Sequence, residues 1–351
     1  MKTKKGIAIV FAFCLPMLFT GCGIQKKKPD TRGGIYRSED SASMFEQKAT
    51  IKGGGTIGNA SIRALSMDPK NSNLLYVGTP SGIYKSEDRG ENWIKDSSDF
   101  KNVRDVEINP SDTNEIYVPA TVNGVGKIMK TSDGGENWEE VFTQRTQEGS
   151  VFTIAINPRR PKELFAGDSG GALYKTSDAG ATWKTVLWEK SGINLIKFDS
   201  INTNKLYFVT TRTGAKRSDD GGENFIAIES KGTIYNLIPH PYKEGIVFLS
   251  DNNGLHKSVD GGANLTAINT LVRPKAISSK GIAIDPKNDR IIYFVSGKAI
   301  YKTQNGGESW KPIQFSVPSR KIEMLVIDPD DTKTIYLGTR KLVKKKGMFT
   351  F

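Results

Sequence analysis

Short apolar stretches recur along almost the whole chain, and each one ends at a polar turn. One kind of stretch alternates apolar and polar residues and ends in Asp-Pro or Asn-Pro, as in IRALSMDP (62–69) and VRDVEINP (103–110). A second, more uniformly apolar stretch follows after a few polar residues, as in LLYVGT (74–79). β-Branched and aromatic residues favour strands, while Gly and Pro interrupt them. The pattern therefore predicts short antiparallel strands rather than helices.

Two further strands complete each unit of roughly 40–48 residues. The third strand is represented by GIYKS (82–86) and ALYKT (172–176), and the fourth by WEEVF (138–142) and WKTVL (183–187). Four short strands with a turn signal between each pair predict one four-stranded antiparallel sheet per unit.

A single phrase, Ser/Thr-x-Asp-x-Gly-x-x-aromatic, separates the third strand from the fourth. Its copies are SEDRGENW (86–93), TSDGGENW (131–138), TSDAGATW (176–183), SDDGGENF (218–225), SVDGGANL (258–265), TQNGGESW (303–310) and a worn SEDSASMF (38–45). One sheet cannot bury both of its faces alone, whereas repeated sheets arranged around an axis bury them against each other. The repeat therefore predicts a radially repeated all-β architecture.

We predict an all-β fold, a seven-bladed β-propeller of four-stranded antiparallel blades, as a single domain over residues 34–351. Residues 34–49 hold the last two strands of a unit, and residues 322–340 hold the first two. The last blade is therefore expected to be closed by strands from both termini. A further strand from the tail at 346–351 remains an open alternative.

The Asp phrase is expected to be structural. Its acidic or amide residue can accept backbone N–H bonds within a hairpin turn, its glycine permits positive φ, and its tryptophan can fill the gap between sheets. These residues are Asp40, Asp88, Asp133, Asp178, Asp220, Asp260, Asn305, Trp93, Trp138, Trp183 and Trp310. A calcium loop is the alternative, but no copy gathers the five or six oxygen ligands that calcium prefers.

The N-terminus reads as a processing signal. Lys2, Lys4 and Lys5 precede an apolar run, and the sequence then reads Phe-Thr-Gly-Cys, ending at Cys22. This resembles the lipobox of bacterial lipoproteins, with Phe in place of the usual Leu. The resemblance implies a signal peptide at 1–21 and lipidation of Cys22, which would start a basic linker at 22–33. The alternative, an uncleaved membrane anchor, would need about 20 apolar residues.

Composition excludes several chemistries. The chain has two cysteines, Cys14 and Cys22, and two histidines, His240 and His256. Zinc, haem, iron–sulfur and Ser-His-Asp sites are therefore disfavoured, and we expect no metal and no cofactor. The net charge of +12 falls to +9 once the three lysines of the signal are removed. Without stacking aromatics beside these charges, we expect no nucleic-acid partner.

The repeated phrase resembles the Asp-box, or BNR repeat, of sialidases, sortilin-type receptors, two-propeller xyloglucanases and the photosystem II assembly/stability factor. The similarity covers about residues 34–340. Asp-Pro after the first strand and Gly-x-Tyr-Lys-Ser before the box make the chain most similar to the sortilin-like and photosystem-assembly-like propellers. The resemblance is specific for the fold and poorly specific for activity.

One end of the predicted ring varies between units, as binding loops on a rigid support do. The candidate binding residues on that end are Lys52, Lys101, Arg145, Lys190, Arg212, Lys231, Arg273 and Lys275. A positive face favours an acidic peptide, an anionic glycan or a lipid headgroup. A solvated basic rim without a ligand is the structural alternative.

No catalytic set is apparent, so we predict a non-catalytic scaffold that binds a protein or peptide. We expect it at the cell envelope, held on the extracytoplasmic side of a bacterial membrane by lipid on Cys22. The alternative is a glycoside hydrolase of the sialidase or xyloglucanase type, which needs two facing carboxyl groups. The loop acids available for that role are Asp99, Asp168, Glu189 and Asp251. The Arg-Ile-Pro motif of sialidases is absent from the sequence.

Overall fold

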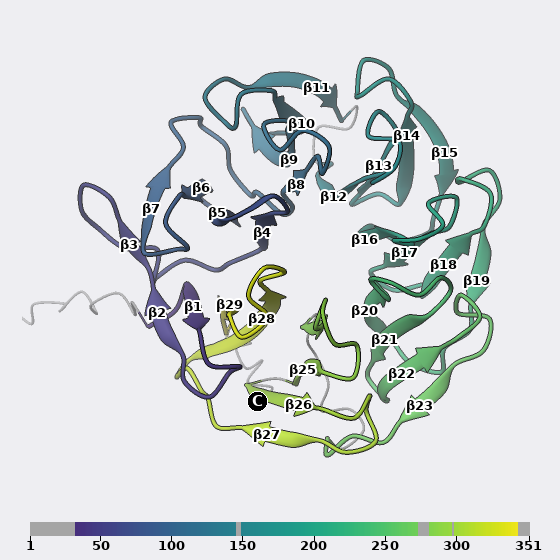
Figure 1. The fold of residues 1–351 in the computed structure, drawn as a ribbon. Coiled ribbons are helices and arrows are strands. Elements are labelled where there is room, and N and C mark those ends of the chain that lie inside the picture. The colour runs from purple at the N-terminus through teal and green to yellow at the C-terminus, as the bar shows by residue number, and fades with distance from the viewer. Residues whose placement is uncertain (1–31, 145–148, 273–280, 297, 343–351) are drawn as a thin grey trace, which may run out of the picture.

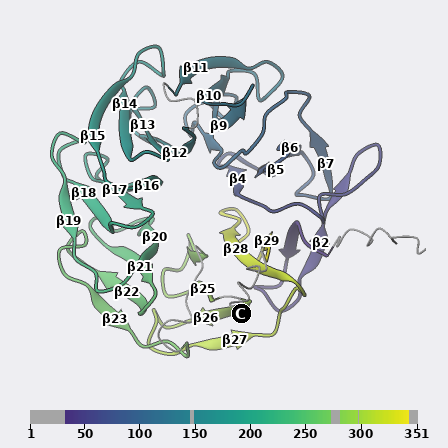
Figure 2. The same ribbon diagram turned by 180° about the vertical axis from the view of Figure 1, so that it is seen from behind.

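Seven antiparallel sheets surround a central axis in the computed structural model, which describes residues 32–144, 149–272, 281–296 and 298–342 (Figure 1). The seven-bladed propeller predicted from the repeats is confirmed. In each blade the first strand lies next to the axis and the fourth lies at the rim (Figure 2). Within the described residues, no helical segment has the length and apolar character needed to cross a bilayer.

Six blades are built from consecutive strands. Blade 2 contains β4 (Ala64–Asp68), β5 (Asn71–Thr79), β6 (Gly82–Ser86) and β7 (Asn92–Lys95). Blade 3 contains β8 (Glu107–Ile108), β9 (Ile116–Val122), β10 (Val125–Thr131) and β11 (Glu139–Thr143). Blade 4 contains β12 (Val151–Ile156), β13 (Leu164–Asp168), β14 (Ala172–Thr176) and β15 (Lys184–Trp188).

The remaining consecutive blades follow the same order. Blade 5 contains β16 (Ile193–Phe198), β17 (Leu206–Thr210), β18 (Ala215–Ser218) and β19 (Ile226–Ile228). Blade 6 contains β20 (Ile234–Pro239), β21 (Val247–Asp251), β22 (Gly254–Ser258) and β23 (Thr266–Ile268). Blade 7 contains β24 (Ile282–Ile284), β25 (Ile292–Ser296), β26 (Ala299–Thr303) and β27 (Lys311–Ile313).

Blade 1 closes the ring with strands from both parts of the chain. It consists of β28 (Arg320–Ile327), β29 (Ile335–Lys341), β1 (Ile35–Ser38) and β2 (Glu46–Lys48). Strands β1 and β29 pair antiparallel, from Ile35↔Gly338 to Ser38↔Ile335. The predicted composite blade is therefore confirmed. The tail at 346–351, the signal at 1–21 and Cys22 lie outside the described residues.

Blade 2 differs from the four-stranded prediction because it carries a fifth strand. Strand β3 (Thr50–Ile51) runs parallel to β7, with Thr50 opposite Asn92. The chain that leaves β2 crosses the seam between blades 1 and 2, and the Lys52 N–H donates to the Trp93 carbonyl at 2.8 Å. This pairing fastens the composite blade to its neighbour.

All seven Asp phrases form the same turn. The Ser or Thr hydroxyl donates to the Asp or Asn oxygen at 2.6–2.8 Å. That oxygen also accepts the backbone N–H four residues later at 2.8–3.0 Å. In blade 4, bonds from Thr176 and Thr182 lower the pKa of Asp178 to about 2. Asn305 makes the same backbone contact as the aspartates, so the turn needs the oxygen and not its charge.

The box tryptophans pack against the preceding blade. Trp93 is fully buried, and its indole N–H donates to the Lys48 carbonyl on β2 at 2.9 Å. Trp183 donates in the same way to the Val141 carbonyl on β11 at 3.0 Å. Trp138 donates instead to the Asp96 carboxylate, and Trp310 to its own turn. Trp93 and Trp183 therefore contact the neighbouring blade across the gap between sheets, which is the packing role expected for them.

A second contact between blades uses the fourth residue of the box, whose carbonyl accepts from the preceding blade. The buried Tyr76 hydroxyl on β5 donates to the Gly134 carbonyl at 3.1 Å. In the same way, the hydroxyls of three further tyrosines donate to carbonyls of the following blade: Tyr117 to Ala179, Tyr336 to Arg89 and Tyr293 to Ser41. Lys175 reaches Gly221, and Arg217 reaches Gly261. A tyrosine or a basic residue thus links six of the described neighbouring pairs of blades through one repeated acceptor.

Two tyrosines at the same position of the repeat provide a matched test of this link. The buried Tyr207 hydroxyl has no hydrogen-bond partner, whereas Tyr76 donates to Gly134. We expect Tyr76→Phe to lower the free energy of unfolding by about 1 kcal/mol, because it leaves the Gly134 carbonyl without this donor. Tyr207→Phe should be neutral or stabilising. Urea unfolding monitored by tryptophan fluorescence measures both variants, and equal losses would contradict the assignment.

Candidate functional site

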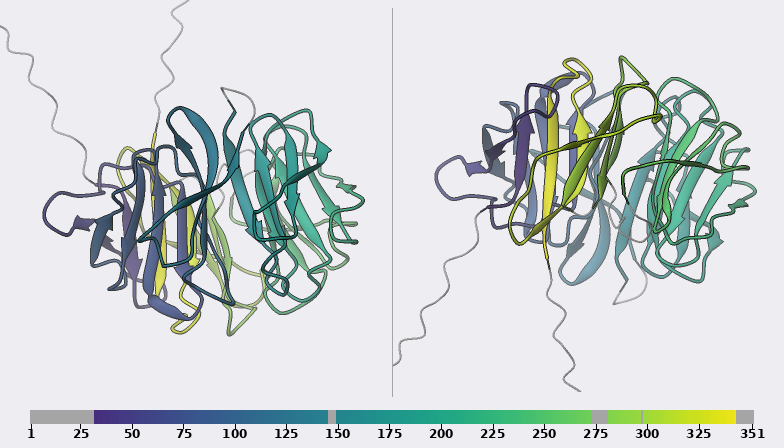
Figure 3. Two further views of the ribbon diagram at one scale, coloured as in Figure 1. Left: turned by 90° about the horizontal axis from the view of Figure 1, so that it is seen from above. Right: turned by 90° about the horizontal axis from the view of Figure 1, so that it is seen from below.

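The two ends of the ring carry different connections (Figure 3). The Asp-Pro turns and the boxes share one end, here called the box end; in blade 2 the Arg89 N–H of the box donates to the Asn73 carbonyl beside the first turn at 3.0 Å. The remaining connections form the opposite end, here called the loop end. The boxes repeat one geometry, so variation between blades is concentrated at the loop end.

The predicted binding residues that the structure describes are all exposed. They are Lys52, Lys101, Lys190, Arg212 and Lys231. Arg145, Arg273 and Lys275 lie outside the described residues. Of the five described residues, Lys101 alone forms an ion pair with another described residue, the exposed Asp99. The other four cations are free to meet a ligand.

These residues do not form one cluster. The loops that carry Lys190 and Arg212 are joined, because the Thr211 N–H donates to the Gly192 carbonyl at 2.7 Å. Lys52 instead follows β3, at the periphery of the ring in Figure 1. The predicted face therefore resolves into a pair on blades 4 and 5 and scattered positions elsewhere.

Two of the four nominated acids hold turns. Asp168 is fully buried and accepts bonds from the Tyr174 hydroxyl at 2.9 Å and from the N–H groups of Gly170 and Ala172 at 2.8 and 2.9 Å. The Gln144 amide donates to Oδ2 of Asp168, the same oxygen that accepts from Tyr174. This set of donors fixes the turn between β13 and β14, so the carboxylate serves the fold.

Asp251 has the same role in blade 6. It accepts from the N–H groups of Asn253 and Gly254, from Ser230, and from a ring nitrogen of His256 at 3.0 Å. Burial alone would raise the pKa of Asp251, but the bonds from Ser230 and His256 outweigh it and lower that pKa. The Asp251 carboxylate is therefore ionised, and its oxygens are used as hydrogen-bond acceptors within the blade.

The other two nominated acids are neutralised locally. Glu189 pairs with Lys216 at 2.7 Å, and Asp99 pairs with Lys101. Among the described residues, no group of three His, Cys, Asp or Glu side chains is arranged to hold a metal ion.

A stronger cationic feature lies where the inner strands begin. Arg63 directly precedes β4, Arg104 precedes β8, and Arg340 lies on β29 opposite Lys321. We call Arg63, Arg104 and Arg340 the arginine cluster. The Arg104 guanidinium lies 4.2 Å from the centre of the Phe152 ring on β12. The cluster therefore spans blades 1 to 3 at the loop end.

The cluster is only partly neutralised. Arg340 pairs with Glu323 at 3.3 Å, whereas neither Arg63 nor Arg104 has an ion pair with a described residue. Burial, and then the charge of Arg340, lowers the pKa of Arg63. Burial, followed by the charges of Arg63 and Arg340, lowers the pKa of Arg104. Guanidinium groups remain protonated at neutral pH, so their mutual repulsion favours an anion between them.

The arginine cluster was not predicted from the sequence, although a signal for it is present there. Arg63, Arg104 and Phe152 each lie five residues before the Asp or Asn that ends the first strand of their unit. Aligning the units at that residue would have placed the three side chains at one level beside the axis.

Comparison with known proteins gives a family match. The model of the family described as photosynthesis system II assembly factor YCF48 matches residues 60–244, more than half of the chain.

Curated relatives match over only part of their length. A probable oligoxyloglucan-reducing end-specific xyloglucanase of Neosartorya fischeri is 26% identical over 147 residues, which cover 37% of this chain and 18% of the relative. A xyloglucanase of Hypocrea jecorina is 23% identical over 224 residues, 62% of this chain and 26% of the relative. The chain thus spans about a quarter or less of these two relatives.

Solved structures share the fold. The GH74 enzyme of Niastella koreensis has a TM-score of 0.66 and 18% identity, covering 80% of this chain and 51% of that chain. YCF48 from Cyanidioschyzon merolae has a TM-score of 0.61 and 13% identity, with 80% and 95% covered. A structure titled YCF48 bound to D1 peptide has a TM-score of 0.58 and 16% identity, with 80% and 93% covered.

The structural role of Asp168 is testable against the exposed Asp99. We expect Asp168→Ala to lower the free energy of unfolding by about 2–4 kcal/mol, because it leaves buried donors without an acceptor. Asp99→Ala should leave stability unchanged. Chemical unfolding midpoints measure both, and a stable Asp168→Ala protein would contradict the role assigned to this carboxylate.

Proposed function

This chain belongs to the family of the photosynthesis system II assembly factor YCF48, and on that premise we propose that it is a non-catalytic assembly factor. It binds a segment of a client membrane protein through carboxylate groups of that segment. The binding surface is the arginine cluster at the loop end of the ring.

The observation that carries this proposal is the unneutralised charge of Arg63 and Arg104. A guanidinium presents planar donors that match a carboxylate in a bidentate way. Phe152 supports Arg104 from one side, which limits the rotamer entropy lost when a ligand binds. A peptide carboxylate placed between these residues would relieve the repulsion within the cluster.

The solved relatives support a peptide as the ligand class. The structure titled YCF48 bound to D1 peptide comes from a propeller that this chain matches over 93% of its length. For the present chain we propose only an acidic or free-carboxylate peptide from a membrane protein. Lys190 and Arg212, which lie on joined loops, extend the positive face outward and would attract such a segment.

Glycoside hydrolysis is the weaker alternative. It is favoured by the matches to xyloglucanases, but the two curated xyloglucanases described above are each covered over less than a third of their length. Asp168 and Asp251 are occupied as acceptors within their own turns. Asp99 and Glu189 pair with lysines. None of the four is free to act as a general acid or a nucleophile in this conformation.

We also propose a lipid anchor on Cys22. The support is the sequence of residues 1–22, with its basic start, apolar run and terminal Gly-Cys. Lys26, Lys27 and Lys28 follow and would interact with anionic headgroups. Such an anchor would hold the propeller on the extracytoplasmic side of a bacterial membrane, where a client protein can reach it.

Loss of the arginines tests the binding surface. We expect Arg104→Met and Arg63→Met each to weaken binding of a fluorescent acidic peptide by about tenfold or more, because each removes a charge-assisted contact. Binding should also weaken as salt is raised from 50 to 300 mM. Fluorescence anisotropy measures both effects, with the C-terminally amidated peptide as a comparison.

Two controls make this test specific. Lys333→Met changes an exposed lysine at the box end and should leave binding unchanged. The double variant Lys190→Glu/Arg212→Glu should slow association more than it speeds dissociation. Unchanged affinity in both arginine variants would overturn the proposed surface, and loss confined to the double variant would move it to the outer loops.

The anchor has its own test. We expect Cys22→Ser to abolish incorporation of labelled palmitate and to shift the protein from the membrane fraction to the soluble fraction, because one thiol carries the lipid. Cys14→Ser, within the predicted signal, serves as the control and should keep both properties. Continued lipid labelling of Cys22→Ser would contradict the anchor without affecting the peptide site.

A further inference from the structure

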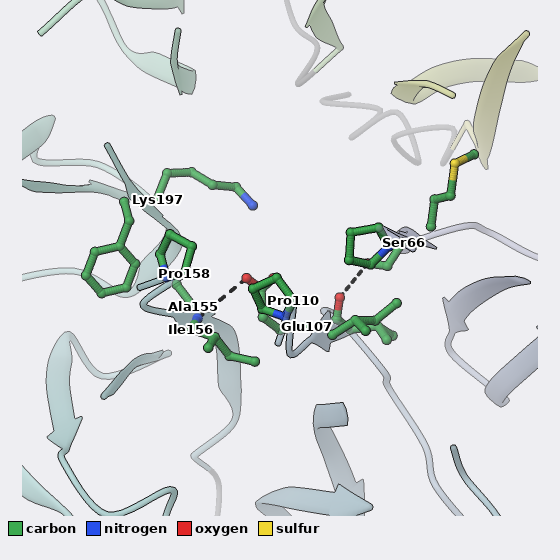
Figure 4. Close-up of a pocket in the computed structure, with 12 residues that line it drawn as sticks. Ser66, Glu107, Pro110, Ala155, Ile156, Pro158 and Lys197 are labelled. Carbon is green, nitrogen blue, oxygen red and sulfur yellow. Dashed lines mark hydrogen bonds between the residues drawn. The ribbon is translucent and has the colours of Figure 1, made fainter. Parts of the chain in front are cut away.

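A cavity of about 320 Å³ opens at the box end of the axis, opposite the arginine cluster. Its wall is formed by the inner strands β4, β8, β12 and β16, together with prolines of three successive Asp/Asn-Pro turns (Figure 4). These prolines are Pro69, Pro110 and Pro158. The lining is mostly apolar, with a few polar groups directed inward, as in sites for small ligands.

Lys197 is the cation of this cavity. It lies on β16, is half-buried, and has neither a hydrogen bond nor an ion pair with any described residue. In Figure 4 its side chain extends into the open space toward the blades across the cavity. Its counterpart on β12 is Ala155, whose small side chain leaves this space open. Burial disfavours the charged form of Lys197, but the charges of Glu107 and Asp105 outweigh it and raise the pKa of Lys197, so the side chain is an ammonium. A half-buried ammonium that forms no hydrogen bond with a described residue points to a group that the cavity receives.

Glu107 on β8 supplies the opposite charge. Its carboxylate accepts only a long bond, 3.5 Å from the Ile156 N–H, and forms no ion pair with Lys197 or any other described cation. Burial raises the pKa of Glu107 to about 7; the charge of Lys197 opposes this and that of Asp105 adds to it. Two opposite charges therefore line one cavity and act on each other through space, but they form no ion pair.

We propose that this cavity binds a small zwitterion, an α-amino acid with an apolar side chain. The carboxylate of the ligand meets Lys197 and its ammonium meets Glu107. The apolar side chain packs on Phe198, Met67 and the turn prolines. A volume at the low end of ligand sites fits a molecule of this size.

Singly charged ligands fit less well. A simple anion would be attracted to Lys197 but repelled by Glu107, which lines the cavity, and by the nearby Asp105, which does not. A simple cation would be repelled by Lys197. A zwitterionic ligand forms a charge-assisted hydrogen bond with Lys197 through its carboxylate and another with Glu107 through its ammonium.

Binding should depend on pH in a defined direction. The ligand ammonium needs ionised Glu107, so protonation of that carboxyl weakens binding as pH falls. The charged groups that act on Glu107 are Asp105, two residues before it and outside β8, and Lys197 on β16. Strands β4 and β12 contribute the uncharged Ser66, Ala155 and Ile156. With a pKa of about 7 for Glu107, affinity should fall about tenfold from pH 8 to pH 6.

Calorimetric titration of the full chain with L-leucine, L-valine and L-phenylalanine at pH 8 tests the proposal. We expect at least one of them to bind, and its N-acetyl and carboxamide derivatives to bind at least tenfold more weakly, because each derivative lacks one charge. Absence of binding by all three amino acids, or equal binding by the blocked derivatives, would overturn the proposal.

Variants locate the site and separate it from the peptide surface. Lys197→Met and Glu107→Gln should each weaken amino-acid binding at least tenfold. Lys205→Met changes a lysine in the same blade as Lys197 and removes its ion pair with Glu244 of blade 6; amino-acid binding should remain unchanged in this variant. Arg104→Met should also keep amino-acid binding while it loses the acidic peptide, so the two proposals fail independently. Circular dichroism confirms folding, and binding that survives both cavity variants would contradict the assigned site.

Discussion

A backbone carbonyl at the fourth position of the box joins each described blade to the one before it, with the exception of blade 7. The turn presents this carbonyl because two successive residues adopt positive φ, as at Gly134 (φ 71°) and Gly135 (φ 99°). A tyrosine or basic side chain of the preceding blade then donates to it. Each such bond contributes about 1 kcal/mol. The box is thus a local turn and a joint between blades at once.

The repeated contacts explain why the fold could be predicted from sequence while parts of the site could not. Seven copies of one turn provide seven independent indications of the same sheet. The blade with the degenerate copy at Asp40 is therefore still predicted correctly. Even there, Ala42 adopts φ 73° in place of the usual glycine. Strand β3 was not predictable, because its pairing with Asn92 depends on how the chain crosses the seam.

Side-chain roles were harder to predict because they depend on partners distant in sequence. Asp168 looked like a free loop carboxylate, but Gln144 approaches it from the end of the preceding blade. Arg63 and Arg340 act on each other only because the ring closes between blades 1 and 2. Positions of the inner strands, aligned across units, carry more information about the site than loop length does. The inner strands thus lie between two different sites, the arginine cluster at the loop end and the cavity with Lys197 and Glu107 at the box end.

The composite blade also determines when the molecule can fold. The Thr339 hydroxyl donates to the Gly34 carbonyl across 305 residues of sequence, and β1 pairs with β29 over the same span. Until β29 has been synthesised, β1 and β2 have no partner sheet, and the first and last blades each lack a packed face. Such long-range pairing slows folding and leaves strand edges exposed meanwhile. During synthesis the nascent propeller is therefore an open arc, and the ring closes only when the last two strands, β28 and β29, arrive.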